Sequence, residues 1–379
     1  MVQVSQFNAV QGLFFTIPIF CIATMFAMGL DITVEDAVAP LRNLLALAVI
    51  VLVNNVFVPL VALVVIALPT LLAGGPFSGF AQLIAPLEGG QTIGFLLLVL
   101  ASGSILGPTF AKISGATDAF AKGMMIALVV ASALLLPIEL KLLNSFEIGV
   151  ATGFESGTIF TLLLLFQLLP LALGIVINVR YAAVAVRLRP LIVQLTGLSF
   201  LILLALFLMS SNATQQVTQP QQVAQPLEIV SKVLAGLEDL PMIGGIIKIL
   251  EQLITIVWPY AVLAAVAAII MIIGYYGGVA VRNIVGASGS GIPHSMASST
   301  VVRNVSFALI LAAEYASSSL DDGVQAIGMV LIFYLVSLII AAHKAVQWGA
   351  EGKTGDVGLE DMVAELTEDI DALGVGGGS

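Results

Sequence analysis

The chain has 379 residues, of which 59% are hydrophobic and 9% are charged, and its mean hydropathy is +1.12. A soluble domain usually carries about 25% charged residues, so this composition excludes a soluble globular fold for most of the chain. Lipid must be the solvent for much of its surface. The formal net charge is -10, and the single cysteine, Cys21, excludes an intramolecular disulfide and a multi-cysteine metal site.

Nine segments are long and apolar enough to cross a bilayer, which takes about 20 apolar residues per helix. They lie at about 11–30, 43–69, 88–110, 119–143, 157–179, 190–210, 255–281, 297–315 and 324–347. The first has no basic region before it and no cleavage site after it, so we expect a span rather than a removable signal peptide. The pattern predicts an all-α membrane protein with nine transmembrane helices.

Two of these segments carry residues that break a helix. The third contains Ser102, Ser104 and Thr109 within a run that also holds Gly103, Gly107 and Pro108. The eighth follows a Gly- and Ser-rich stretch, 286–293, and continues through a polar run to Thr300. Irregular backbone at membrane depth survives only where protein or water satisfies it, so we expect breaks near 102–109 and 286–300 that line a cavity.

Four regions follow from this pattern. Residues 1–210 hold helices one to six, and 255–347 hold helices seven to nine. Between them, 211–254 is predicted as an extracytoplasmic insertion, with a Gln- and Pro-rich linker and one or two amphipathic interfacial helices. Residues 348–379 form an acidic tail, predicted to be solvated and cytoplasmic.

The orientation follows from the basic residues. Arg180, Arg187 and Arg189 share one short loop, and this loop should be cytoplasmic under the positive-inside rule. We therefore expect an integral plasma-membrane protein with the N-terminus outside and the C-terminus inside. Lipid is then its main surroundings, and no nucleic acid is expected as a partner.

Polar residues within the spans are the candidate functional groups. Asn54 and Asn55 lie mid-way along the second segment, and an interhelical hydrogen bond and a ligand role remain equally open for them. Arg303 and Asn304 lie inside the eighth segment, where an arginine costs roughly 2.5–3.5 kcal/mol on insertion scales. No enzyme signature accompanies them: no predicted span contains an aspartate, and two histidines are too few for a metal cluster. We expect neither a catalytic nor a metal site.

Several motifs, in order, resemble the bile acid:sodium symporter family. The run Met25-Phe-Ala-Met-Gly-Leu30 is similar to the family's signature, and Asn54 precedes Pro59 by the family's offset. The run from Leu168 to Gly174 and the Gly-Tyr pair at 274–275 are similar to later family motifs. The resemblance covers about 11–347 without the insertion. It implies a nine-helix form with a panel domain and an inverted-repeat core, in which two broken helices cross.

The chain departs from the family at the sodium sites that the resemblance implies. In place of a Glu-x-Gly-x-Gln-Asn run it has Ser298, Ser299, Thr300 and then Arg303 and Asn304, with no acid. Lys122 stands where the family has a serine near sodium. A fixed ammonium or guanidinium can neutralise the oxygens that hold Na⁺, so these departures argue against sodium coupling. Lys122 is then a candidate for proton coupling by titration, and Arg303 a candidate for binding an anion.

The sequence thus predicts a secondary active transporter of a small organic anion that works by alternating access, proton-coupled or uncoupled, with no cofactor. Its candidate substrate- and ion-binding residues are Asn54, Asn55, Ser102, Ser104, Thr109, Lys122, Ser299, Thr300, Arg303 and Asn304. The alternative is a membrane sensor or receptor that keeps the fold without transport. Thiol-dependent oxyanion efflux is disfavoured, because Cys21 lies away from both predicted breaks.

Overall fold

A computed structural model describes residues 2–72, 89–114, 118–145, 156–214, 243–286 and 291–352 of the chain. The described part is helical throughout and contains no strand. The acidic residues from 353 onward and most of the predicted insertion, 215–242, lie outside the described residues.

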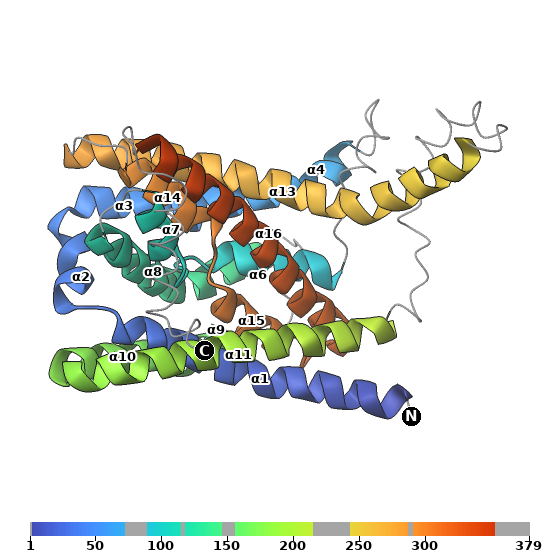
Figure 1. The fold of residues 1–379 in the computed structure, drawn as a ribbon, viewed down its shortest axis with the longest axis horizontal. Helices are drawn as coiled ribbons and strands as arrows, with labels where there is room; N and C mark the ends of the chain where they lie inside the picture. Colours follow the sequence, from blue (N-terminus) through green and yellow to red (C-terminus); the bar gives the residue numbers. More distant parts are fainter. Residues whose placement is uncertain are drawn as a thin grey trace, which may run out of the picture.

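The helices follow one another in the order drawn in Figure 1. They are α1 (Val2–Leu30), α2 (Val34–Val38), η1 (Ala39–Arg42), α3 (Leu44–Leu52), η2 (Val53–Phe57), α4 (Val58–Leu72), α6 (Gly90–Leu100), α7 (Gly107–Ile113), α8 (Asp118–Ser145), α9 (Ser156–Leu163), η3 (Leu164–Leu168), α10 (Leu169–Arg180), α11 (Ala182–Thr214), α13 (Ile243–Val285), α14 (Gly291–Val301), α15 (Val305–Tyr315) and α16 (Leu320–Gly352). The prediction of an all-α fold is confirmed for these residues.

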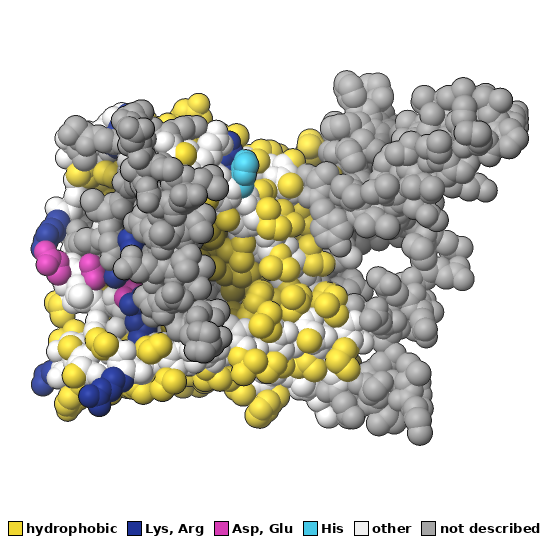
Figure 2. All heavy atoms as spheres, viewed as in Figure 1, with side chains coloured by type: hydrophobic (Ala, Val, Ile, Leu, Met, Phe, Trp, Pro, Cys, Tyr) yellow, Lys and Arg dark blue, Asp and Glu magenta, His cyan; other side chains and the backbone are white. Residues whose placement is uncertain are grey.

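Eight stretches of the described residues are helical, long and apolar enough to cross a membrane. They are Ala9–Leu30, Leu44–Leu68, Phe120–Leu143, Gly157–Arg180, Ala182–Ser210, Val262–Val285, Gly291–Tyr315 and Leu320–Ala350. The remaining predicted segment, the third at 88–110, is divided between the short apolar helix α6 and α7. In Figure 2 apolar side chains cover the middle of the visible face, and charged ones gather towards one end, as in a helical membrane protein.

The helices fall into two packed groups. α1 packs mainly against α10 and α11, and these three lie together along one side of Figure 1. α1 and α10 approach closely where Gly29 meets Gly174, since a Cβ on Gly29 would lie 2.3 Å from the carbonyl oxygen of Leu171. On the other side, α13 packs against α14, and α16 against α6.

Residues 243–254 differ from the sequence prediction. An amphipathic interfacial helix was expected to end near 254, but these residues form the first turns of α13, which runs unbroken to Val285. The stretch of this helix that is apolar enough to cross a membrane is Val262–Val285.

Two helices widen into π-helical turns two residues before a proline. η2 precedes Pro59 and η3 precedes Pro170. Proline has no N–H to donate within a helix, and a wider turn is one way for the helix to absorb that loss. Both turns carry buried amides, namely Asn54 and Asn55 in η2 and Gln167 in η3. The widening thus places polar groups inside the protein.

Candidate functional site

The two discontinuous helices meet at their breaks. α6 and α7 are separated by 101–106, and α14 and α15 by 302–304. The backbone N–H of Asn304 donates a hydrogen bond to the carbonyl oxygen of Ala101 at 2.9 Å. α7, the second half of one interrupted helix, packs against α14, the first half of the other. In the same way, α6 packs against α15. The two interrupted helices therefore run antiparallel and touch at the point of interruption.

The predicted position of the first break is largely confirmed, and that of the second is wrong. Residues 291–301, expected to be interrupted, form the regular helix α14. Pro293 is its third residue, and the first turn of a helix tolerates proline because its N–H groups have no partner there. The interruption falls instead at 302–304, in a stretch without glycine or proline.

Glycines allow the breaks to pack closely. Gly103 has a φ of 88°, which ordinary side chains rarely adopt, and a Cβ there would lie 2.7 Å from both Cγ2 and the backbone nitrogen of Val129. A Cβ on Gly107 would lie 2.9 Å from Oγ of Ser299. The polar side of α14 therefore lies directly against the start of α7.

Arg303 lies at the centre of the crossing and is 1% exposed. Its Nη1 donates to Oδ1 of Asn54 at 3.2 Å, and its Nη2 donates to the backbone carbonyl oxygen of Asn54 at 3.2 Å. In a regular helix the N–H of Val58 would occupy that carbonyl, but in η2 it bonds to Val53 instead. The π-helical turn thus frees the oxygen that the guanidinium uses.

A second polar cluster surrounds the first break. The hydroxyls of Ser102 and Ser132 lie 2.6 Å apart, and both donate to Oδ1 of Asn55, at 3.1 and 3.0 Å. The Ser132 hydroxyl also accepts a hydrogen bond from the backbone N–H of Ser102 at 2.9 Å. Ser132 on α8 was not predicted, because a serine in an apolar run is common in membrane helices and gives no signal on its own.

Four buried polar atoms at the second break have no hydrogen-bond partner among the described residues. They are Oγ of Ser299, Oγ1 of Thr300, Nε of Arg303 and Nδ2 of Asn304. The other side-chain atom of Asn304, Oδ1, caps α15 by accepting from the N–H of Phe307 at 3.2 Å and the hydroxyl of Ser306 at 2.8 Å. All four free atoms can donate a hydrogen bond, and one belongs to a guanidinium. Such a set suits an anion.

Three predicted residues lie apart from this set. Ser104 is buried and shares a side-chain hydrogen bond with Tyr334 on α16. Thr109 is exposed on α7. Lys122 lies near the start of α8, where its Nζ is 3.3 Å from Oδ2 of Asp31 at the end of α1. The family resemblance implies a position near sodium for Lys122, and in the structure its ammonium contacts this carboxylate.

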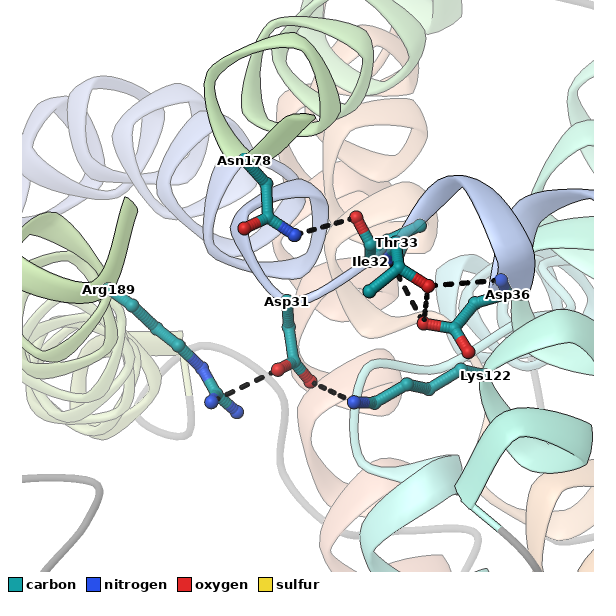
Figure 3. Close-up of polar contacts among 7 residues, drawn as sticks. All are labelled: Asp31, Ile32, Thr33, Asp36, Lys122, Asn178 and Arg189. Atoms are coloured by element: carbon teal, nitrogen blue, oxygen red, sulfur yellow. Dashed lines mark hydrogen bonds and ion pairs between the residues drawn. The ribbon is translucent and has the colours of Figure 1, made fainter. Parts of the chain in front are cut away.

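Asp31 joins two basic residues from different helices. Figure 3 shows its carboxylate between Lys122 and Arg189, whose Nη1 lies 3.0 Å from Oδ1 of Asp31. Asn178 on α10 donates to the backbone oxygen of Ile32 at 2.8 Å, which fixes the next residue of the same turn. The end of α1 is therefore tied to α8, α10 and α11 together.

One acidic residue was overlooked in the sequence. Glu139 lies inside the α8 span, and its charge interacts with that of Arg303. Oε2 of Glu139 is buried and has no hydrogen-bond partner among the described residues. The run 298–304 lacks the family's acid, but Glu139 brings a carboxyl near Arg303 from another helix. A carboxylate within a predicted span is rare enough to have been a signal by itself.

Two further findings limit what the site can be. Gln167 in η3 is 2% exposed, and within the described structure neither atom of its amide has a partner. No group of three or more His, Cys, Asp or Glu residues that could hold a metal ion occurs in the described ranges. Beside the two breaks, the polar groups described above are hydroxyls, amides, the guanidinium of Arg303 and the carboxyl of Glu139.

Comparison with known proteins adds no assignment. No protein-family model matches this chain, and no curated protein matches it either. What the chain does is therefore argued from its own helices and its own buried polar groups.

Proposed function

We propose that this protein is a secondary active transporter of a small organic anion that works by alternating access around the two crossing helix breaks. The observation that carries the proposal is the backbone hydrogen bond from Asn304 to Ala101 beside the buried Arg303. Interrupted helices that meet within a membrane are how many transporters build a binding site near the midplane. The donors left unpartnered at the second break support an anionic substrate.

The arrangement we propose has nine membrane passages, counting α6 and α7 together as one. The spans formed by α1, by α9 with η3 and α10, and by α11 serve as the panel, and the other helices form a core of two inverted repeats. The protein lies in the plasma membrane with its N-terminus outside. This is the fold of the bile acid:sodium symporter family, which we propose as the relative on the motifs described above.

The coupling ion we propose is not sodium. The guanidinium of Arg303 already neutralises the side-chain and backbone oxygens of Asn54, both at 3.2 Å. Sodium needs several free oxygen ligands, and a fixed cation at this place takes two of them and repels another cation. A proton gradient or simple exchange remains as the driving mechanism.

Reconstituted proteoliposomes test the proposal directly. We expect counterflow of labelled organic anions, tested with succinate and with the permanently ionised isethionate, at equal rates in Na⁺ and in K⁺. Arg303→Ala should abolish this exchange, while Arg187→Ala, which removes an exposed arginine on α11, should leave it intact. Strict dependence on Na⁺ would contradict the uncoupling from sodium.

The sensor alternative is supported by one observation. Arg303 is held by two hydrogen bonds to Asn54, and Asp31 ties α1 to α8, so both groups of helices are fastened in this conformation. A protein whose thermal midpoint rises with succinate or isethionate, but which shows no counterflow, would be a receptor with a transporter fold.

A further inference from the structure

Glu139 lies on the face of α8 that looks towards the two breaks. It follows Ser132 by seven residues, which is two helical turns, so the two side chains share one face about 10 Å apart along the axis. Ser132 bonds to Asn55 and Ser102 at the first break, and Leu136 and Leu140 between and beside them are buried. The glutamate therefore belongs to the packed side of the helix.

The surroundings of this carboxyl are unusual for an ionised group. Oε2 is enclosed and has no donor among the described residues, although the residue as a whole is partly exposed. The charge of Arg303 interacts with Glu139, but within the described structure the two form no direct ion pair, because the guanidinium bonds to Asn54. A carboxyl oxygen that is enclosed without a donor favours the protonated form of the group. The charge of Arg303 nearby changes in effect when this proton is gained or lost, even without a direct bond.

Arg303 is the charged neighbour on this side of α8. Five of the elements packed against α8 contain no acidic or basic residue. They are α3, α6, α9, η2 and η3. α2, η1, α7 and α14 do carry such residues, at the opposite end of α8, where Lys122 meets Asp31 and Ser114 meets Ser298. These groups are Glu35, Asp36, Arg42, Lys112 and His294. On α8 itself Lys141 is exposed.

We propose that Glu139 is the proton-binding residue that couples anion transport to a proton gradient. This inference rests on the proposed function. A proton from water adds to the carboxylate of Glu139 and gives the neutral acid, and the same proton leaves to water on the other side of the membrane. While Glu139 is neutral, the positive charge of Arg303 is uncompensated and attracts the anion. When Glu139 is ionised, its negative charge offsets Arg303 and repels the anion.

Proton and anion therefore load and leave together, which is symport. By linkage, protonation raises anion affinity by the same factor as anion binding raises proton affinity. The sign is fixed by the charges, so anion affinity falls as the pH rises through the range where Glu139 titrates. This assignment also moves the coupling role from Lys122, which is ion-paired with Asp31, to a group beside the breaks.

The test uses the full chain in proteoliposomes with isethionate, which cannot cross lipid as a neutral acid, and protein-free liposomes as a blank. An inward proton gradient of one pH unit should concentrate isethionate up to about tenfold through the wild-type protein. Glu139→Gln should lose this accumulation while counterflow continues, and its isethionate binding should become independent of pH. The matched control Glu314→Gln, on α15, should accumulate as the wild type does.

The outcomes distinguish a failure of the role proposed for Glu139 from a failure of the proposed transport function. Wild-type protein that exchanges anions while Glu139→Gln still accumulates them overturns the inference alone. Wild-type protein without any counterflow overturns the proposed function and the inference with it. If Glu139→Gln does not fold, Glu139→Asp keeps the carboxyl and should keep accumulation with a shifted pH profile of binding. A wild-type binding profile that is flat with pH also contradicts the inference.

Discussion

The backbone N–H of Asn304 lies 2.9 Å from the carbonyl oxygen of Ala101, although the two residues belong to different helices and are far apart in the sequence. The bond satisfies a backbone group in each break at a depth where water is scarce. Buried backbone groups without a partner are costly in lipid, so each break stabilises the other.

Asn304 also provides a stability test through its side chain. Asn304→Ala removes the cap of α15 and should lower the free energy of unfolding by about 1 kcal/mol. Asn304→Ser is the control, since serine caps a helix about as well as asparagine. Its free energy of unfolding should be close to that of the wild type. Thermal unfolding of the detergent-solubilised variants gives the comparison. Equal losses for alanine and serine would show that the cap is not the cause.

Gly103 should tolerate no side chain. Its positive φ costs an alanine about 1–2 kcal/mol, and the overlap with Val129 at 2.7 Å adds to this. Gly286 has a φ of 68° but nothing within 4 Å of its Cβ position, so Gly286→Ala measures the cost of the positive φ without a steric overlap. We expect Gly103→Ala to have a lower midpoint of thermal unfolding than Gly286→Ala, and a lower yield of folded protein in size-exclusion chromatography. A Gly286→Ala protein as unstable as Gly103→Ala would contradict the packing argument.

The ion pairs of Asp31 should be weak but measurable. Lys122 and Arg189 lie partly exposed on either side of the carboxylate, so each pair should couple by about 0.5–1 kcal/mol. A double-mutant cycle with Asp31→Asn and Lys122→Gln, read by thermal unfolding at low and high salt, measures this. The coupling should shrink as salt is added. A coupling near zero at low salt would mean that the contact contributes nothing.

Removal of Arg303 should create a response to cations. Arg303→Ala leaves Oδ1 and the backbone oxygen of Asn54 without their donor, and it vacates the space of the guanidinium beside them. We expect the Tm of this variant to rise with added NaCl relative to choline chloride, while the wild-type Tm is the same in both. Arg187→Ala should behave as the wild type. A sodium-dependent wild-type Tm would contradict the idea of a built-in cation.

The membrane-spanning helices could be predicted from the sequence, because an apolar run of about 20 residues in so hydrophobic a chain has few other structures available. It misplaced the second break because Gly and Pro near 286–293 are local signals, and Pro293 turned out to begin a helix. The true break at Val302, Arg303 and Asn304 depends on partners at Ala101 and Asn54, which no local pattern reveals. The contact between Lys122 and Asp31 was not predicted for the same reason, since Asp31 follows another helix. Glu139 was readable within its span and was missed.

The contact between Arg303 and Asn54 joins positions 249 residues apart. Ribosomes extend a chain by about 5–20 residues per second, so Asn54 is made about 12–50 seconds before Arg303. During that interval the freed carbonyl and amide of the second helix need a temporary partner, such as water, lipid headgroups or an insertion factor. The nascent protein is therefore most vulnerable to degradation between synthesis of its first and last thirds. Variants at either residue should therefore also lower the cellular amount of the protein.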